Sequence, residues 1–364
     1  MAGQPTDEVP RLERFAPSTV NALMACPYRV ALMRSGRAPR LPGTFTALGQ
    51  VAHSIHEEAW SGKFTGQRGD ALWTALADAW DRLVAREDEA LRTAYALAQP
   101  PLPADWPGYA ITRSRTLLRL SRLIEAPRGN GDRRAVRPEL EISDPHSGLF
   151  GRVDRLETTA EGVRIIDLKS GAWQEEVTEE QRRQLMLYAA IVHASSGTWP
   201  SEVAIEDAGG REWALPVAPE EVRLLVALAN DVVSTYNAAA SRGWSAIEGL
   251  ARPSDETCGN CVARIACEPY WRELKSDWQY HGAARGRMVK RLESVGAGAI
   301  VIETESPHDR AGAPTVIYRI DVEVAVEDIV AVVGAEQRDD PGTLRCRWNS
   351  QLEIQRIEKL PAAS

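Results

Sequence analysis

The sequence predicts an α/β protein whose core is a mixed β-sheet flanked by helices, followed by a small β-rich region. Helical periodicity dominates the first 126 residues, and short strands separated by glycine-rich turns follow over residues 137–169. A helix, a strand and a second helix are then predicted over residues 178–240. This order fits a sheet covered by helices on both faces. From residue 284 onward, short β-like segments alternate with Gly-rich turns, a pattern compatible with a small barrel.

Four helices are predicted before the sheet, because apolar residues recur there at helical spacing. Ser18 is a cap signal ahead of Val20 and Leu23, and Pro100 follows the end of the third helix. The four predicted helices cover residues 16–34, 47–60, 70–98 and 109–126. The third and fourth lie in a helical insertion expected at residues 60–127.

Strands are predicted between turn signals such as Gly148 and Gly162. The sheet strands are predicted at residues 137–142, 149–157, 163–169 and 201–206, and the helices that follow at 178–195 and 218–240. The C-terminal strands are predicted at residues 286–293, 299–304, 315–323, 328–333 and 343–348. We therefore expect two domains, at residues 14–274 and 275–364. The second is expected to be an OB-like nucleic-acid module or a protein-docking domain, and the acidity of its tail favours docking.

Composition indicates an ordinary globular chain: 44% of the residues are hydrophobic, 26% are charged, and the net charge is −8. No apolar run approaches the length of a membrane span, and the first residues do not resemble a signal peptide. We therefore expect a cytoplasmic protein without membrane contact. Thiols stay reduced in that compartment, so the five cysteines favour metal ligation over disulfides.

Basic residues are clustered even though the net charge is negative. Arg113, Arg115, Arg119 and Arg122 fall on one predicted helix, which we expect to contact a phosphate backbone. A later cluster is formed by Lys275, Arg285, Arg287, Lys290 and Arg291. For each cluster, a solvated surface without a ligand is the alternative interpretation.

The strongest chemical pattern is a pair of aspartates on adjacent predicted strands. Asp154 stands in Gly-Arg-Val-Asp-Arg, and Asp167 lies two residues before Lys169. A hairpin of that length can bring both carboxylates to one edge, where oxygen ligands suit Mg²⁺ or Mn²⁺. Residues i and i+2 of a strand face the same way, so Lys169 can orient a water or offset phosphate charge. Leu168 points into the core, but its carbonyl can face the metal. A solvated hairpin with a surface Asp–Lys pair is the alternative.

Other side chains are candidates to complete this site. His53 is a plausible additional metal ligand, and His56, one turn away, competes for that role. Glu139 and Glu141 precede the first aspartate on the previous strand and point the same way, so either can supply a third carboxylate.

A helix predicted after the second aspartate carries Gln184 and Tyr188. These residues are spaced i and i+4, hence they share one helix face. Both can donate hydrogen bonds to a phosphate, although an ordinary helix surface is the alternative.

Together these residues resemble the PD-(D/E)xK nuclease superfamily, specifically its RecB-like branch with a four-cysteine iron–sulfur cluster. The matching segments are Phe15–Asn21, Cys26–Arg29, Gly49–His53, Gly151–Arg155, Asp167–Gly171 and Gln184–Tyr188. The resemblance implies a restriction-endonuclease-like core in which His53, Asp154 and Asp167 hold the metal. It also implies that Lys169 assists the water and that Gln184 and Tyr188 support the site or contact DNA. Glu139 is our choice for the family's upstream glutamate.

Three cysteines form a tight group, Cys258-x2-Cys261-x5-Cys267. Tetrahedral zinc and cubane clusters both need four ligands, and the spacing leaves Cys26 and Cys346 as candidates for the fourth. Cys346 lies in a predicted strand and is expected to be a small core residue. The resemblance implies that Cys26 joins the other three around a four-iron, four-sulfur cluster, which would tie the first helix to the end of the nuclease domain. Zinc is the alternative.

We expect a metal-dependent nuclease that cuts DNA at single strands or ends, in repair, recombination or phage defence. The preference for ends comes from the resemblance. The alternative is a catalytically silent DNA-binding or helicase-scaffold protein that keeps the nuclease fold and a structural cluster. The chain has no Gly-x4-Gly-Lys-Ser/Thr loop, so any motor would be a separate helicase or defence-complex subunit.

Overall fold

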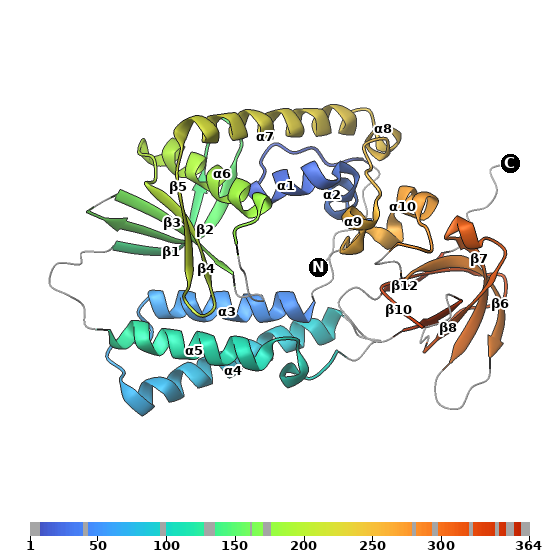
Figure 1. Ribbon diagram of the computed structural model, residues 1–364, viewed down its shortest axis with the longest axis horizontal. Helices are drawn as coiled ribbons and strands as arrows, with labels where there is room; N and C mark the ends of the chain where they lie inside the picture. Colours follow the sequence, from blue (N-terminus) through green and yellow to red (C-terminus); the bar gives the residue numbers. More distant parts are fainter. Residues whose placement is uncertain are drawn as a thin grey trace.

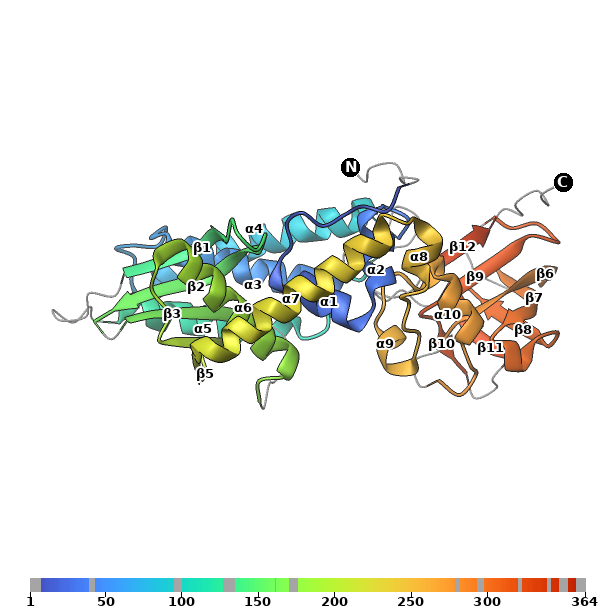
Figure 2. The same ribbon diagram turned by 90° about the horizontal axis from the view of Figure 1, so that it is seen from above.

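The computed structural model describes most of the chain as an elongated molecule (Figures 1 and 2). The described residues are 8–38, 43–94, 100–126, 135–160, 162–169, 176–278, 282–292, 298–319, 323–338, 342–346 and 353–357. None of the helices in these ranges is both long and apolar enough to cross a membrane.

The first sheet is mixed, as predicted, and the described residues give it five strands. They are β1 (Ala135–Ser143), β2 (Phe150–Thr159), β3 (Gly162–Lys169), β4 (Glu202–Asp207) and β5 (Glu212–Pro216), in that spatial order. Neighbouring strands are antiparallel except β3 and β4, which are parallel because α6 (Glu179–Ser196) connects them. β5 was not predicted; it pairs with β4 after a turn that contains Gly210, whose φ is +87°.

Helices with an apolar inner surface cover one face of this sheet (Figure 1). Of these helices, α6 packs directly on the strands and α7 (Pro219–Ala240) packs on α6. α1 (Pro17–Ala25) packs on α6 and α7, and α2 (Pro27–Arg34) follows it. The single helix predicted at 16–34 is wrong: it is broken at Cys26, whose backbone is extended, and Pro27 begins the next helix. Ser18 is not the cap either, since Ala16 holds that position and Pro17 starts the helix.

The other face is covered by a layer of three long helices with its own apolar core. They are α3 (Thr44–Trp60), α4 (Gly69–Ala94) and α5 (Tyr109–Glu125), with a short 3₁₀ turn, η1 (Pro103–Asp105), before α5. These helices agree with the predicted ones, except that the end predicted for α4 lies outside the described residues. Trp80, fully buried, belongs to this core.

A second sheet follows short connecting elements, namely α8 (Trp244–Glu248), α9 (Asp255–Gly259), η2 (Arg264–Ala266) and α10 (Glu268–Glu273). Its strands are β6 (Ala284–Leu292), β7 (Ala299–Ser306), β8 (Pro314–Tyr318), β9 (Ile329–Val333), β10 (Glu336–Gln337), β11 (Thr343–Arg345) and β12 (Glu353–Ile357), with η3 (His308–Arg310) after β7.

The second sheet curls on itself like part of a barrel (Figure 1). Its order among the described residues is β10-β11-β8-β7-β6-β9-β12, so β10 and β12 add to the five strands that were predicted. Cys346 is buried in the core inside the curl, as expected of a core residue. On its outer side, Ala331 and Val333 of β9 pack against Tyr270 and Trp271 of α10, joining the sheet to the cysteine-bearing segment.

Candidate metal centre and cysteine pocket

The two aspartates lie where strands β2 and β3 separate. The paired residues of this hairpin run from Thr159↔Gly162 to Arg155↔Ile166, and the ladder stops there. One residue further, the carboxylate of Asp154 accepts a hydrogen bond of 2.7 Å from the backbone N–H of Leu168. Asp154 therefore fills the opening of a fork, and its carboxylate replaces the next rung of the ladder.

Three potential metal ligands meet at this fork. Ligand atoms of His53, Glu139 and Asp154 all lie within 4.8 Å of one another, and this is the only such group of three among the described residues. His53 Nδ1 is 3.4 Å from Asp154 Oδ1, because α3 passes beside the open end of the hairpin. Two carboxylates and one imidazole form a donor set that suits Mg²⁺ or Mn²⁺.

Glu139 reaches the group through an unusual backbone conformation. The register of β1 and β2 places it opposite Asp154, and its φ is +49°, in the left-handed region that non-glycine residues seldom adopt. Such strain is typical of functional positions. The carboxylate of Glu139 also forms an ion pair with Arg152. The structure thus brings Glu139 to the site, while Glu141 is not part of the group.

Asp167 and Lys169 lie next to this group. Lys169 Nζ is 2.7 Å from Asp167 Oδ2, and Asp167 is only 9% exposed. Asp167, predicted as a metal ligand, is therefore engaged by the lysine and stands outside the group of three. Leu168 is buried as expected, and the contact that it makes at the site is through its N–H. We call His53, Glu139, Asp154, Asp167 and Lys169 the fork centre.

The electrostatics of the fork centre favour a bound cation. Burial and the charge of Asp154 raise the pKa of Glu139. Burial also raises the pKa of Asp167, against the effect of Lys169. Burial disfavours the charged form of His53, but hydrogen bonding to Asp154 and the surrounding carboxylates outweigh this and raise the pKa of His53. A divalent cation would relieve the repulsion among these carboxylates.

Helix α6 packs against the strands of the fork through Tyr188. The Tyr188 ring lies so close to Gly151 that a Cβ there would stand 2.6 Å from its Cε1 atom. Glycine is therefore needed at this point of β2. Gln184 is hydrogen-bonded to the Tyr188 side chain, and burial raises the pKa of Tyr188, so its hydroxyl stays protonated. The structure thus places both residues beside the aspartates rather than on an ordinary helix surface.

His56, the competitor of His53, is fully buried away from the group of ligands. Its Nδ1 lies 2.8 Å from the carbonyl oxygen of Ala52, and burial lowers the pKa of His56 to about 3. It is therefore a neutral structural side chain.

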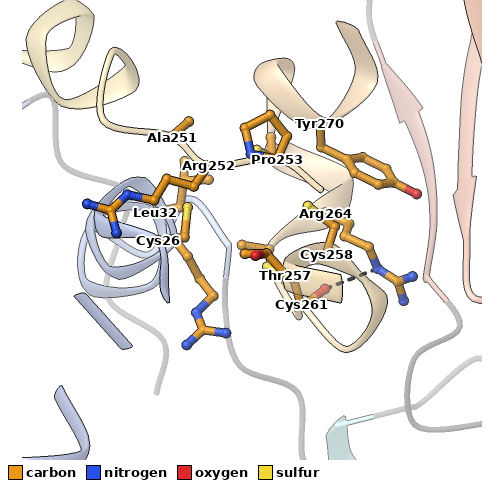
Figure 3. A pocket seen from close by; sticks show the side chains of 13 residues that line it. Cys26, Leu32, Ala251, Arg252, Pro253, Thr257, Cys258, Cys261, Arg264 and Tyr270 are labelled. Atoms are coloured by element: carbon orange, nitrogen blue, oxygen red, sulfur yellow. Dashed lines mark hydrogen bonds between the residues drawn. The ribbon is translucent and has the colours of Figure 1, made fainter. Parts of the chain in front are cut away.

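Four cysteines, Cys26, Cys258, Cys261 and Cys267, line one pocket, which we call the cysteine pocket. Figure 3 shows Cys26, at the joint of α1 and α2, across the pocket from Cys258 and Cys261. The wall of the pocket also contains Arg252, which donates a hydrogen bond of 2.5 Å to the carbonyl oxygen of Met24 and so ties the two sides together.

The thiols of this pocket are not packed against one another. In the described part of the chain, no three cysteine sulfurs lie within 4.8 Å of one another. A tetrahedral zinc site with Zn–S bonds of about 2.3 Å would hold its sulfurs about 3.8 Å apart. Burial raises the pKa of Cys258 to about 11, so its thiol is protonated without a bound metal.

The basic clusters are only partly available to a ligand. Arg119 is largely covered and forms an ion pair with the buried Glu206, so the expectation of a phosphate contact is wrong for this residue. Arg113 is 3.8 Å from Asp81. In the later cluster, Arg285 pairs with Glu268, and Arg287 pairs with Glu303 and Glu327.

The sequence interpretation missed the charged residues beneath the fork, Arg155 and Glu206, which form an ion pair at 2.7 Å. A carboxylate directly after the apolar run Val203–Ile205 was a signal that it is buried and paired, because an unpaired charge is costly there.

Comparison with known proteins agrees with the geometry of the fork. No curated protein sequence is significantly similar to this chain. The family model of the PD-(D/E)XK nuclease superfamily matches residues 14–268, which include every residue of the fork centre and all four pocket cysteines. This match identifies the superfamily and not one of its branches. Because it covers most of the chain, the chain belongs to the PD-(D/E)XK nuclease superfamily.

Proposed function

We propose that this protein is a Mg²⁺- or Mn²⁺-dependent deoxyribonuclease that hydrolyses phosphodiester bonds at the fork centre. The observation that carries the proposal is the convergence of His53, Glu139 and Asp154 within 4.8 Å, beside an Asp167–Lys169 pair. Superfamily membership suggests a metal-dependent nuclease and implies a nucleic-acid substrate.

Each residue of the fork centre has a proposed part. His53, Glu139 and Asp154 would hold the metal, with Asp167 and the Leu168 carbonyl as further ligands. A bound divalent cation would supply Lewis-acid chemistry to a phosphoryl group and lower the pKa of a water. Lys169 offers an ammonium beside this point, suited to orienting a water or offsetting phosphate charge.

Gln184 and Tyr188 would position the substrate or the fork. This role is supported by the position of both residues beside the aspartates. The hydroxyl of Tyr188 stays protonated and can donate a hydrogen bond.

The substrate preference that we propose is for single-stranded DNA or duplex ends. It follows from the resemblance to the RecB-like branch with its restriction-endonuclease-like core. We further propose that the chain works in a reducing cytoplasm, with a separate helicase or defence-complex subunit as its partner.

For the cysteine pocket we propose a four-iron, four-sulfur cluster. The donor chemistry fits, because four thiols from two distant parts of the chain line one pocket. Their spread favours a ligand larger than a single zinc ion. The cluster's proposed role is structural.

We propose domain boundaries at residues 14–274 and 275–364, with a helical insertion at 60–127. The insertion corresponds to the α4–α5 part of the layer that has its own apolar core. The curled C-terminal sheet is our candidate for an OB-like module, or for the surface that docks a protein partner.

The test is cleavage by the purified chain of end-labelled single-stranded, blunt duplex and closed circular DNA, with Mn²⁺, Mg²⁺ or EDTA. We expect metal-dependent cleavage of the single strands and of the duplex ends, with the closed circles resistant. If no DNA form is cut with either metal, the silent DNA-binding or helicase-scaffold function becomes the better conclusion. Iron and zinc analysis of protein purified without oxygen tests the cluster; stoichiometric zinc without iron would overturn it.

A further inference from the structure

A chain of buried ion pairs lies under the fork, between the first sheet and the helical layer. Glu206 of β4 is 0% exposed, and Arg155 of β2 donates to its Oε2 at 2.7 Å. Arg119 of α5 forms an ion pair with the other oxygen of the same carboxylate. Two guanidinium groups from two different layers thus share one buried carboxylate. We call Arg119, Glu206 and Arg155 the bridge.

At the α5 end of the bridge, Arg119 packs against the turn between β4 and β5. Arg119 also donates a hydrogen bond of 3.2 Å to the carbonyl oxygen of Asp207. A Cβ at Gly210 would stand 3.2 Å from the Arg119 guanidinium carbon, so the glycine leaves the space that the arginine occupies. Arg119 is only 14% exposed.

The β2 end of the bridge contacts helix α3. The guanidinium carbon of Arg155 lies 4.9 Å from the centre of the Trp60 ring, and Arg155 Nε is 2.8 Å from Glu157. Trp60 in turn lies 5.3 Å from the ring of His56, one turn from His53 on the same helix. The bridge therefore reaches from α5 through β4 and β2 to the helix that carries a proposed metal ligand.

The same residues adjoin the fork. Arg155 directly follows Asp154 and is the last residue of β2 that pairs with β3 before these two strands separate. Replacing a buried ion pair by apolar side chains is often neutral for stability, so such groups are better suited to fixing one arrangement than to adding stability. In this protein, the bridge fixes the position of the helical layer (α3, α4 and α5) on the first sheet.

We infer that the bridge positions α3 so that His53 faces Asp154, and that metal affinity at the fork centre depends on Arg119. Arg119, Glu206 and Arg155 are positioning residues that act through His53 and touch neither metal nor substrate. The inference rests on the proposed metal site, and it assigns the helical layer a function: the layer holds one ligand in place.

The test measures Mn²⁺ affinity by calorimetry without nucleic acid. Arg119→Met keeps the length of the side chain and removes its charge; we expect its Mn²⁺ affinity to fall by about tenfold, as for residues that orient metal ligands. Arg119→Lys should restore part of the loss. Arg122→Met is the matched control, because Arg122 is exposed on the same helix, and its affinity should equal the wild-type value.

A double-mutant cycle separates positioning from a general loss of structure. If Arg119 acts through His53, Arg119→Met should have no further effect on Mn²⁺ affinity in a His53→Ala background. An equal loss in both backgrounds would overturn the inference. So would a lower melting temperature of Arg119→Met with unchanged Mn²⁺ affinity.

A metal-free measurement keeps this inference distinct from the proposed function. Hydrogen exchange of the α3 amides around His53 should accelerate in Arg119→Met and not in Arg122→Met. If the wild type binds no Mn²⁺, the proposed metal site fails, while faster exchange still supports the anchoring of α3. Unchanged exchange would overturn that anchoring.

Discussion

The fork centre brings its side chains into mutual contact, whereas the four thiols of the cysteine pocket line one cavity without forming such a close group. At the fork, Asp154 is held by the backbone of Leu168 at 2.7 Å, and His53 lies 3.4 Å away. The four thiols line the same pocket, but no three of the described cysteine sulfurs lie within 4.8 Å of one another.

The difference teaches which parts of each site the chain itself fixes. The end of a strand ladder fixes the fork, so its carboxylates are in place before any ligand binds. The pocket is formed by segments far apart in the sequence, Cys26 on one side and residues 258–267 on the other. Contacts between these segments, such as that of Arg252 with Met24, hold the pocket, but its thiols need a common ligand. We expect the fork centre to be preorganised for catalysis, and the cysteine pocket to depend on what it binds for stability.

The largest effect should come from removing the carboxylate at the fork opening. Asp154→Asn should lower the cleavage rate by at least about a thousandfold, because a catalytic metal contributes several kcal/mol. Iron content should not change if the two sites are independent. Glu141→Gln, a neighbouring carboxylate outside the group of ligands, is the control and should cut at the wild-type rate. Equal cleavage by Asp154→Asn and the wild type would show that the metal centre is misassigned.

Substitution of a cysteine in the cysteine pocket should lower the stability of the protein instead of its cleavage rate. If the proposed cluster is present, Cys26→Ser should remove it and with it a cross-link over a long loop, worth about 4–5 kcal/mol in the entropic model. The melting temperature should then fall by on the order of 10 °C. Cys346→Ser, in the separate core of the second sheet, should keep the iron. If Cys26→Ser keeps full iron content, the fourth ligand is another residue.

A smaller loss is expected from the lysine of the fork centre. Lys169→Gln removes the charge but can still donate a hydrogen bond to Asp167, which spares the buried carboxylate. We expect the rate constant for cleavage to fall about a hundredfold or more, the usual effect of losing one charge-stabilising group, while Mn²⁺ affinity changes little. Single-turnover kinetics at saturating Mn²⁺ would measure this. A change in Mn²⁺ affinity with an unchanged rate would assign Lys169 to metal binding instead.

The sequence predicted those features that depend on local patterns. Short strand-like segments bounded by turn signals located β1 to β4, and residue spacing brought out Asp154, Asp167 and Lys169. The break of the first helix at Cys26 was missed because apolar periodicity continues through Pro27. The bridge was missed for a different reason: Arg119 reads as one of four surface arginines until Glu206, far along the chain, is placed beneath it. A local pattern can show that a charge such as Glu206 is buried and paired, but it does not show which distant residue is the partner.

The smallest effect should come from Gly151, which connects the fork to its apolar support. An added methyl group would stand 2.6 Å from Cε1 of Tyr188, so the ring must move and its hydrogen bond with Gln184 must change. Overpacking of this kind costs about 1–3 kcal/mol. Part of that cost should appear as a fewfold loss of Mn²⁺ affinity and cleavage rate in Gly151→Ala. Gly249→Ala is the matched control, because Gly249 has a helical backbone and its nearest contact would be 3.4 Å. In a Tyr188→Leu background, Gly151→Ala should cost nothing further, since the clash is gone. Additive losses in the double variant would mean that Gly151 is required by the strand itself and that Tyr188 does not support the fork.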